Sequence, residues 1–180
     1  TIMSIFIAYT VPEQWSMVMK RERDRQTIFL MKQYARGILA RQTKHNNTDP
    51  VSIEQLQEAK KPRLVRGGKW PMPLTGSEDD WILVPPQALV PNAQGAAPPV
   101  QTQPGVPPQG VAPQQGAMFK LNKELSPADY KGPFVAVRPN YSGKSFIALN
   151  EVEEYSEWVY TVDDLRREIQ ARQAALAAPP

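Results

Sequence analysis

Few residues in this chain could carry acid–base or nucleophilic chemistry. His45 is the single histidine, and it precedes Asn46 and Asn47, where a helix is expected to end. An imidazole there suits the helix dipole and the C-terminal cap, so we interpret it as structural. A serine–histidine pair stays open, but no Gly-x-Ser-x-Gly elbow is present. The absence of cysteine excludes disulfides, thiolate nucleophiles and zinc–thiolate sites, and we expect a protein that is not an enzyme.

Two acidic clusters are the remaining candidates for a metal site. Glu78, Asp79 and Asp80 follow a Gly-Ser turn, and Ca²⁺ binds several such oxygens. Their spacing is not that of an EF-hand, so we favour a solvated turn and expect no cofactor, with calcium as the alternative. The second cluster is a charged strand edge by default, or a partner for basic residues of a neighbouring subunit; its members are Glu151, Glu153 and Glu154.

A long helix, predicted over residues 2–45, opens the chain and should position the rest. Residues 1–11 are uncharged and mostly apolar, and a charged, amphipathic stretch follows Pro12, which should kink the helix. Residues that recur at helical spacing should face a core, namely Ile28, Met31, Tyr34, Ala35, Ile38 and Leu39. Arg25, Lys32, Arg36 and Lys44 mostly face the other way.

The basic residues cluster in this helix. They are Lys20, Arg21, Arg23, Arg25, Lys32, Arg36, Arg41 and Lys44, and Glu22 and Asp24 interrupt the run. We interpret them as a solvated helix face. Binding to nucleic acid is not expected, because no aromatic residues alternate with the cations to form a stacking platform.

The apolar start of the chain indicates a membrane or a packed interior. Its uncharged run of 12 residues is shorter than the roughly 20 that span a bilayer, and no basic region precedes it as in a signal peptide. Either it is a buried helix end, or the sequence lacks its first residues; the absence of an initial Met favours the second. Trp15 is an interfacial anchor or a contact with a neighbouring helix.

The middle of the chain divides into a short helix, a loop with a strand, and a linker. The sequence Thr-Asp-Pro at 48–50 predicts the start of a helix over 51–60, with Ile53, Leu56 and Ala59 inward. Residues 63–84 read as a loop ending in a strand at 81–84. Residues 85–117 have no charge and no aromatic side chain and predict an extended loop or tether, with a PxxP ligand as the alternative.

The last third predicts a small antiparallel sheet and a helix. Strands are expected at 132–138, 144–149 and 157–162, with a turn at 139–143 between the first two. A capping box at 161–164 should open a helix over 163–177, with Leu165, Ile169 and Leu176 on one stripe. The contact between sheet and helix is expected from the large aromatic residues, with a sugar-binding platform as the alternative; they are Trp70, Trp81, Phe134, Phe146 and Trp158.

Several motifs follow one another in a characteristic order. The proline-containing helix leads through RERDRQ into IFLMKQYARGI, and DPVSIEQL follows. The segments KWPMPLTGSEDDWILV and GPFVAVRPNYSGKSFIALNEVEEYSEWVYTV come next, the latter with Tyr155 and Trp158. Over roughly residues 1–84 and 118–162 this order resembles the pseudopilins of type II secretion systems and, more broadly, type IV pilin-like proteins.

The sequence also departs from that family. The family's processed N-terminus, a Phe-type residue soon followed by Glu, is absent, and we expect it to precede Thr1. The Pro/Gln-rich loop and the C-terminal helix are additions. Some pseudopilins of type II secretion bind calcium in a loop, which is the source of the calcium alternative at residues 78–80.

The resemblance implies a structural subunit that is made with a short leader and inserted in the bacterial inner membrane with a periplasmic head. A prepilin peptidase removes the leader, the new N-terminus is methylated, and the helices then pack in an extracellular filament built by a secretion machine. Its partners would be other copies or other pilin-like subunits, the membrane and assembly proteins. The helix contacts would come from Ile2, Ile5, Phe6, Ile7, Val11, Pro12 and Trp15.

We therefore predict an α+β, pilin-like fold with a long N-terminal helix packed on a small antiparallel sheet. Its parts are a membrane or filament-core helix (1–46), the first part of the head (47–84), a linker (85–117), a sheet (118–162) and a C-terminal helix with its tail (163–180). The head core should contain Ile28, Met31, Tyr34, Ile38, Trp81, Phe134, Phe146 and Trp158. The alternative is a membrane-anchored envelope protein whose head binds a partner, with the Pro/Gln segment as tether.

Overall fold

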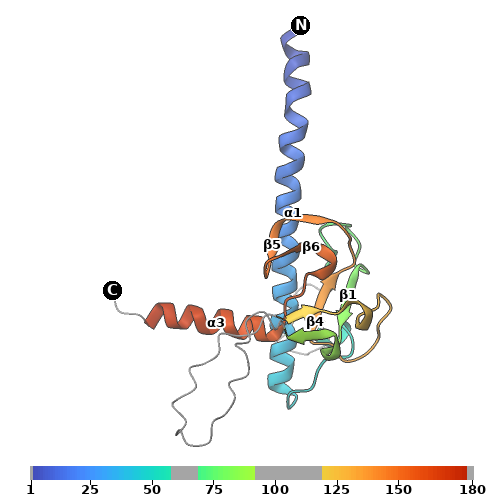
Figure 1. Cartoon of the computed structure of the whole chain (residues 1–180), viewed down its shortest axis with the longest axis vertical. Coiled ribbons are helices and arrows are strands. Elements are labelled where there is room, and N and C mark those ends of the chain that lie inside the picture. Colours follow the sequence, from blue (N-terminus) through green and yellow to red (C-terminus); the bar gives the residue numbers. More distant parts are fainter. Residues whose placement is uncertain (1, 58–68, 92–118, 178–180) are drawn as a thin grey trace, which may run out of the picture.

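One long helix organises the molecule. The structure is a computed structural model that describes residues 2–57, 69–91 and 119–177, with the side chains of the first helix described from Trp15 onward. Helix α1 (Ile2–Lys44) has 43 residues and is about 65 Å long at 1.5 Å per residue. Its C-terminal half lies against the head, and its N-terminal half extends away from it (Figure 1). The helix continues through Pro12, so the predicted helix over 2–45 is confirmed.

The end of α1 is where the asparagines predict it. Asn46 and Asn47 adopt φ angles of 49° and 63°, in the left-handed region that Asn tolerates. The Asn47 N–H donates to the Gln42 carbonyl at 2.8 Å, which satisfies one of the last helical acceptors.

The second helix begins later than predicted. Helix α2 is described over Glu54–Gln57, so the predicted start at residue 51 is wrong, and residues 58–60 of the prediction lie outside the described residues. The backbone before it is tied elsewhere: the Pro50 carbonyl accepts a hydrogen bond from Phe134 N–H at 3.0 Å. Ile53 and Leu56 are buried as predicted, and Ala59 lies outside the described residues.

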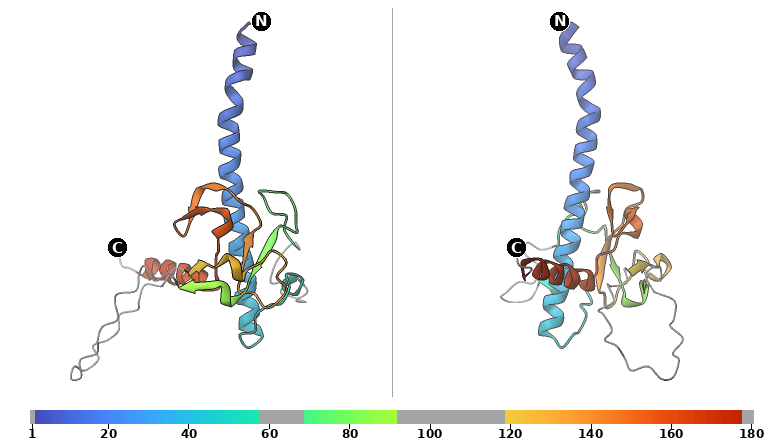
Figure 2. Two further views of the ribbon diagram at one scale, coloured as in Figure 1. Left: turned by 45° about the vertical axis from the view of Figure 1, so that its right-hand side comes forward. Right: turned by 60° about the vertical axis from the view of Figure 1, so that its left-hand side comes forward.

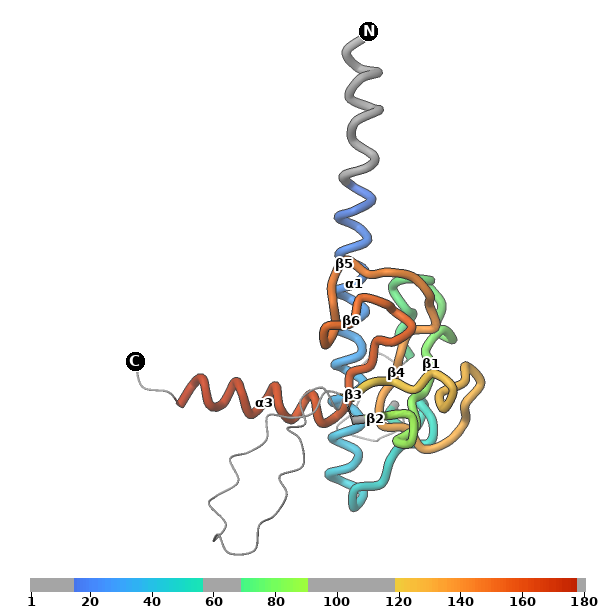
Figure 3. The backbone as a smooth tube through the Cα atoms, in the orientation of Figure 1, coloured from blue at the N-terminus to red at the C-terminus, as the bar shows by residue number. Residues whose placement is uncertain are grey.

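The strands form three antiparallel pairs rather than one sheet. Strand β1 (Trp81–Val84) pairs with β4 (Ala136–Pro139), β2 (Leu89–Pro91) with β3 (Phe119–Leu121), and β5 (Lys144–Leu149) with β6 (Val152–Glu154). Strand β5 lies beside α1, and β6 pairs with β5 (Figure 3). The α+β class is therefore confirmed.

Two predictions about the strands are wrong. The segments 132–138 and 144–149 do not pair, because every residue of β4 is buried against β1 and neighbouring elements, while β5 pairs with β6. The expected strand over 157–162 is absent: Tyr155–Glu157 is the 3₁₀ turn η4, and α3 already begins at Val162. Consecutive burial of residues 158–162 leaves no solvent face for an edge strand.

The predicted linker begins later than residue 85. Pro86–Ala88 forms the 3₁₀ turn η1, with Ala88 buried, and β2 follows directly. The Asn122 N–H donates to the Ala88 carbonyl at 2.8 Å, just before the 3₁₀ turn η3 (Lys123–Leu125). The remainder of the predicted linker, 92–117, lies outside the described residues.

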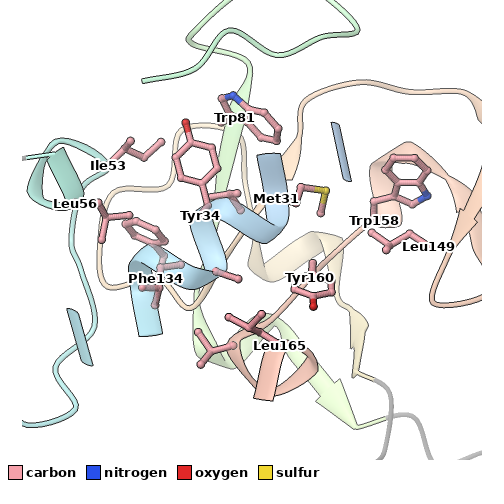
Figure 4. Packing of buried hydrophobic residues seen from close by; sticks show 14 of the residues in the cluster. Met31, Tyr34, Ile53, Leu56, Trp81, Phe134, Leu149, Trp158, Tyr160 and Leu165 are labelled. Atoms are coloured by element: carbon pink, nitrogen blue, oxygen red, sulfur yellow. The ribbon is translucent and has the colours of Figure 1, made fainter. Parts of the chain in front are cut away.

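The core lies between α1 and the strands (Figure 4). Met31, Tyr34 and Ile38 are fully buried on α1, as predicted. They lie in one cluster with Trp81, Phe134, Trp158 and Leu165, and Ile28 packs half-buried at its rim.

Phe146 is a wrong core prediction, since 56% of its surface is exposed. It lies on the outward face of β5, together with Lys144 and Ala148, whereas Leu149 on the other face is buried. Its ring is covered instead by Lys20, whose Nζ lies 5.0 Å from the ring centroid.

Helix α3 (Val162–Ala177) leaves the head at an angle to α1 (Figures 1 and 2). The predicted capping box is confirmed: Thr161 N–H donates to Asp164 Oδ2 at 2.9 Å, and Asp164 N–H donates to Thr161 Oγ1 at 3.2 Å. Of the three apolar residues predicted on one side of this helix, Leu165 is buried, whereas Ile169 and Leu176 are exposed. The helix therefore packs against the head through its first turn.

Two methionines of α1 provide a matched test of this core. Met31→Ala should destabilise the fold by about 2–5 kcal/mol, because it leaves a cavity among fully buried neighbours. Met19→Ala, on an exposed part of the same helix, should change stability by less than about 0.5 kcal/mol. Urea unfolding measures both, and equal losses would contradict the placement of the core.

Candidate assembly interface on the protruding helix

The stem, residues 15–19 of α1, presents apolar side chains to solvent. Trp15, Met17, Val18 and Met19 have exposed fractions between 49% and 65%. At about 100° per residue they point to different sides of the helix. A helix that is apolar on several sides is normally covered by other protein or by lipid. The stem is thus the strongest candidate for an interface.

An apolar line continues from the stem along the outer side of α1. Trp15, Val18 and Phe29 lie on the side opposite the buried Met31 and Ile38, and Phe29 is 57% exposed. A hollow of about 400 Å³ borders Phe29; it is lined by Gln26, Phe29, Leu30, Trp70, Pro71, Met72, Pro73 and Gly76. This arrangement offers a second helix a place to pack.

A buried carboxylate, five residues after the end of the stem, fixes α1 to the head. Asp24 is fully buried, and its Oδ2 accepts a hydrogen bond from Phe146 N–H at 2.9 Å. Its Oδ1 accepts a short hydrogen bond from the Tyr155 hydroxyl. Tyr155 in turn packs edge-on against Trp158, with 4.9 Å between ring centroids. Both carboxylate oxygens are therefore satisfied by the β5–η4 region, and they set where the stem leaves the head.

A second polar contact ties α3 to α1. Glu168 accepts from Lys32 Nζ and from the Tyr160 hydroxyl, each at 2.7 Å. These two hydrogen bonds lower the pKa of Glu168. Lys32 Nζ also lies 5.2 Å from the Tyr160 ring centroid, so one cation contacts both partners.

Aromatic residues brace the buried side of α1. Tyr34 meets Trp70 and Trp81 edge-on, at centroid distances of 5.2 and 5.4 Å. The Trp81 Nε1–H donates to the Trp70 carbonyl at 2.8 Å, and Trp70 N–H donates to the Tyr34 hydroxyl at 3.3 Å. This packing holds the wall of the hollow beside Phe29.

The groups singled out for chemistry are dispersed. His45 is exposed after the last turn of α1, and its N–H donates to the Arg41 carbonyl. Asp79 pairs with Lys69 at 2.6 Å, and Glu154 lies 3.5 Å from Lys123. Within residues 2–57, 69–91 and 119–177, no three His, Cys, Asp or Glu side chains lie together as a metal site would require.

The predicted membrane residues stay mostly outside the description of side chains. Among them, the structure describes the side chain of Trp15; for Ile2, Ile5, Phe6, Ile7, Val11 and Pro12 it describes the helical backbone alone. Among the described helices, none combines the length and the apolar character that a bilayer crossing needs.

Two buried charged residues of the described part of the chain were not predicted from the sequence. Asp24 lies on the same side of α1 as Thr27 and Met31, so its helical position was a usable signal that its charge obscured. Arg138 in β4 donates through Nη2 to the Ser126 carbonyl at 2.7 Å, and burial lowers its pKa. The burial of Arg138 could not be predicted from neighbouring residues, because its hydrogen-bond partner Ser126 lies in another segment.

Comparison with known proteins gives no relative: no family model, no curated protein and no solved structure matches this chain.

The Asp24 contact predicts a large effect of a small substitution. Asp24→Ala should cost about 1–3 kcal/mol or more, because it leaves the Tyr155 hydroxyl and the Phe146 N–H without an acceptor. Glu22→Ala removes an exposed acid two residues away and should cost less than about 0.5 kcal/mol. Urea unfolding of both variants decides, and a harmless Asp24→Ala would exclude a buried junction.

Three tyrosines predict that stability falls in alkali. Burial raises the pKa of Tyr34 to about 12, and burial with the nearby carboxylates Asp24 and Glu168 raises the pKa of Tyr155 and Tyr160. Because folding raises these values, their contribution is complete below the unfolded pKa of about 10 and decreases as the pH rises above it. Tyrosinate absorbance and urea midpoints measured together should show this; a single titration of all tyrosines near pH 10 in the folded protein would contradict it.

Proposed function

We propose that this protein is a structural, pilin-like subunit that assembles through its N-terminal helix into a type II secretion pseudopilus or related type IV filament. The observation that carries the proposal is the protrusion of α1. The helix continues far beyond the head, and its stem exposes apolar side chains on several sides. Such a surface is stable when neighbouring helices or lipid cover it. The order of motifs in the sequence supports the same assignment.

The details of the head are compatible with this role. Asp24 and the Lys32–Glu168 pair attach the head firmly to one side of α1, while Trp15, Val18 and Phe29 remain open on the other. A subunit built in this way can pack helix against helix without unfolding its head. Before assembly the stem would reside in a bacterial inner membrane with the head in the periplasm, and after assembly in an extracellular filament. The role requires no catalytic group.

Engineered cysteines test the assembly, because the chain has none of its own. Val18→Cys, on the exposed stem, should cross-link copies or related subunits in native membranes or sheared filaments when an oxidant is added. Lys131→Cys, exposed on the head, is the matched control and should cross-link much less. Equal cross-linking at the two positions would contradict assembly through α1.

The mature N-terminus of the native protein gives an independent test. Mass spectrometry should find a methylated N-terminal residue upstream of Thr1, with a leader removed. An uncleaved signal-anchor would contradict processing by a prepilin peptidase. Together with absent cross-linking, that outcome would favour a tethered envelope protein whose head binds a partner.

A further inference from the structure

The stem is followed directly by a ring of exposed cations. We call Lys20, Arg21, Arg23 and Arg25 the basic collar; all four are exposed. At about 100° per residue they point to different sides of α1. The collar therefore covers more than half of the circumference of the helix at the level where it meets the head, and it begins about one and a half turns after Trp15.

Burial of Asp24 makes this collar more positive than the sequence indicates. The sequence places Glu22 and Asp24 among the four cations, which looks nearly balanced. In the structure Asp24 is fully buried and hydrogen-bonded to Tyr155 and Phe146. Over residues 15–26, Glu22 is then the one exposed acid, 4.0 Å from Arg25. Glu13 lies about two helical turns before Lys20, roughly 10 Å along the axis.

The head adds an aromatic residue beside the collar. Phe146 is exposed on β5, and Lys20 lies over its ring at 5.0 Å. Phe146 therefore lies at the level of the collar, and Trp15 precedes the collar along α1. Apolar side chains, an aromatic ring and a belt of cations in succession match the layers at a lipid surface, from acyl chains to charged headgroups.

We propose that the basic collar seats the head on an anionic lipid surface, with Trp15 at the headgroup level and Lys20, Arg21, Arg23 and Arg25 on the lipid phosphates. Charge complementarity selects this occupant, since each cation near an anionic bilayer favours binding by about fivefold. The inference rests on the proposed function for the placement of the stem at a membrane. It does not require filament assembly.

Vesicle binding of the full chain tests the collar. Wild-type protein should bind phosphatidylcholine vesicles containing phosphatidylglycerol more tightly than pure phosphatidylcholine vesicles, and salt should remove the difference. The apolar N-terminal part of α1 is the same in both measurements. The ratio of the two affinities therefore isolates the effect of the lipid charge. The triple variant R21Q/R23Q/R25Q should lose this preference by on the order of a hundredfold.

A second triple variant is the matched control. K44Q/K120Q/K131Q removes the same charge from exposed positions away from the stem, and it should keep most of the preference. Thermal melting by circular dichroism should show both triple variants folded like the wild type, since the replaced side chains are exposed. If both triple variants lost the preference for anionic vesicles equally, the preference would depend on net charge alone, and the proposal would be overturned.

Trp15 reports the depth of the seat. Brominated lipids should quench wild-type fluorescence, and Trp15→Phe should abolish that quenching, because the other three tryptophans are buried or half-buried in the head. Equal binding to the two kinds of vesicle would overturn the proposal, and salt-sensitive self-association without lipid preference would assign the collar to a second copy instead. If Val18→Cys still cross-linked in either case, the filament proposal would survive the loss of this inference.

Discussion

The buried stripe of α1 is the constraint on which the rest of the structure depends. Two-stranded ribbons are marginal in water on their own, and the described residues of the head form three of them. Met31, Tyr34 and Ile38 give the β1–β4 and β5–β6 ribbons a common apolar surface, and α2 and α3 pack around it as well. The β2–β3 ribbon packs instead, through Leu89 and Leu121, on a second cluster of Val84, Ala88, Ala136 and Val159. Because the same helix continues beyond the head, the element that holds the core together also carries the proposed interface. Stability of the head and position of the stem are thus coupled through one continuous helical rod.

Polar contacts give that rod a defined orientation. Apolar packing alone tolerates small rotations of a helix, whereas a buried carboxylate that loses its donors is costly. Asp24 fixes the rotation of α1 against β5 and η4, and Glu168 fixes α3 against Lys32. The outward direction of Trp15, Val18 and Phe29 follows from this rotation. Surface contacts such as Lys123 with Glu154 are exposed and contribute little to it.

The sequence predicted what periodicity and local chemistry encode. Each correctly predicted feature is encoded by residues that lie close together in the sequence. These features are the course of α1, its end at the asparagines, the burial of Met31 and Ile38, and the capping box of α3. The pairing of the strands could not be predicted, because β1 with β4 joins segments on either side of the Pro/Gln-rich stretch. Phe146 was misplaced because hydrophobicity does not say which face of a strand is inward, and Lys20 now covers its ring. Asp24 was misplaced because its acceptor role depends on Tyr155, 131 residues away.

The burial of Asp24 links the two proposals. A carboxylate that turns into the head satisfies a structural need at the junction, and the same rotation removes a negative charge from the surface of α1. The surface of α1 therefore changes along the helix. Trp15 and Val18 come first and are apolar and exposed, and four cations follow within the next two turns. After them, one side of α1 enters the core. A uniformly amphipathic helix would lie flat on a surface, with one face in lipid along its whole length. Because α1 instead changes its preferred surroundings along its axis, its pattern suits a rod that stands upright across a boundary between an apolar phase and water.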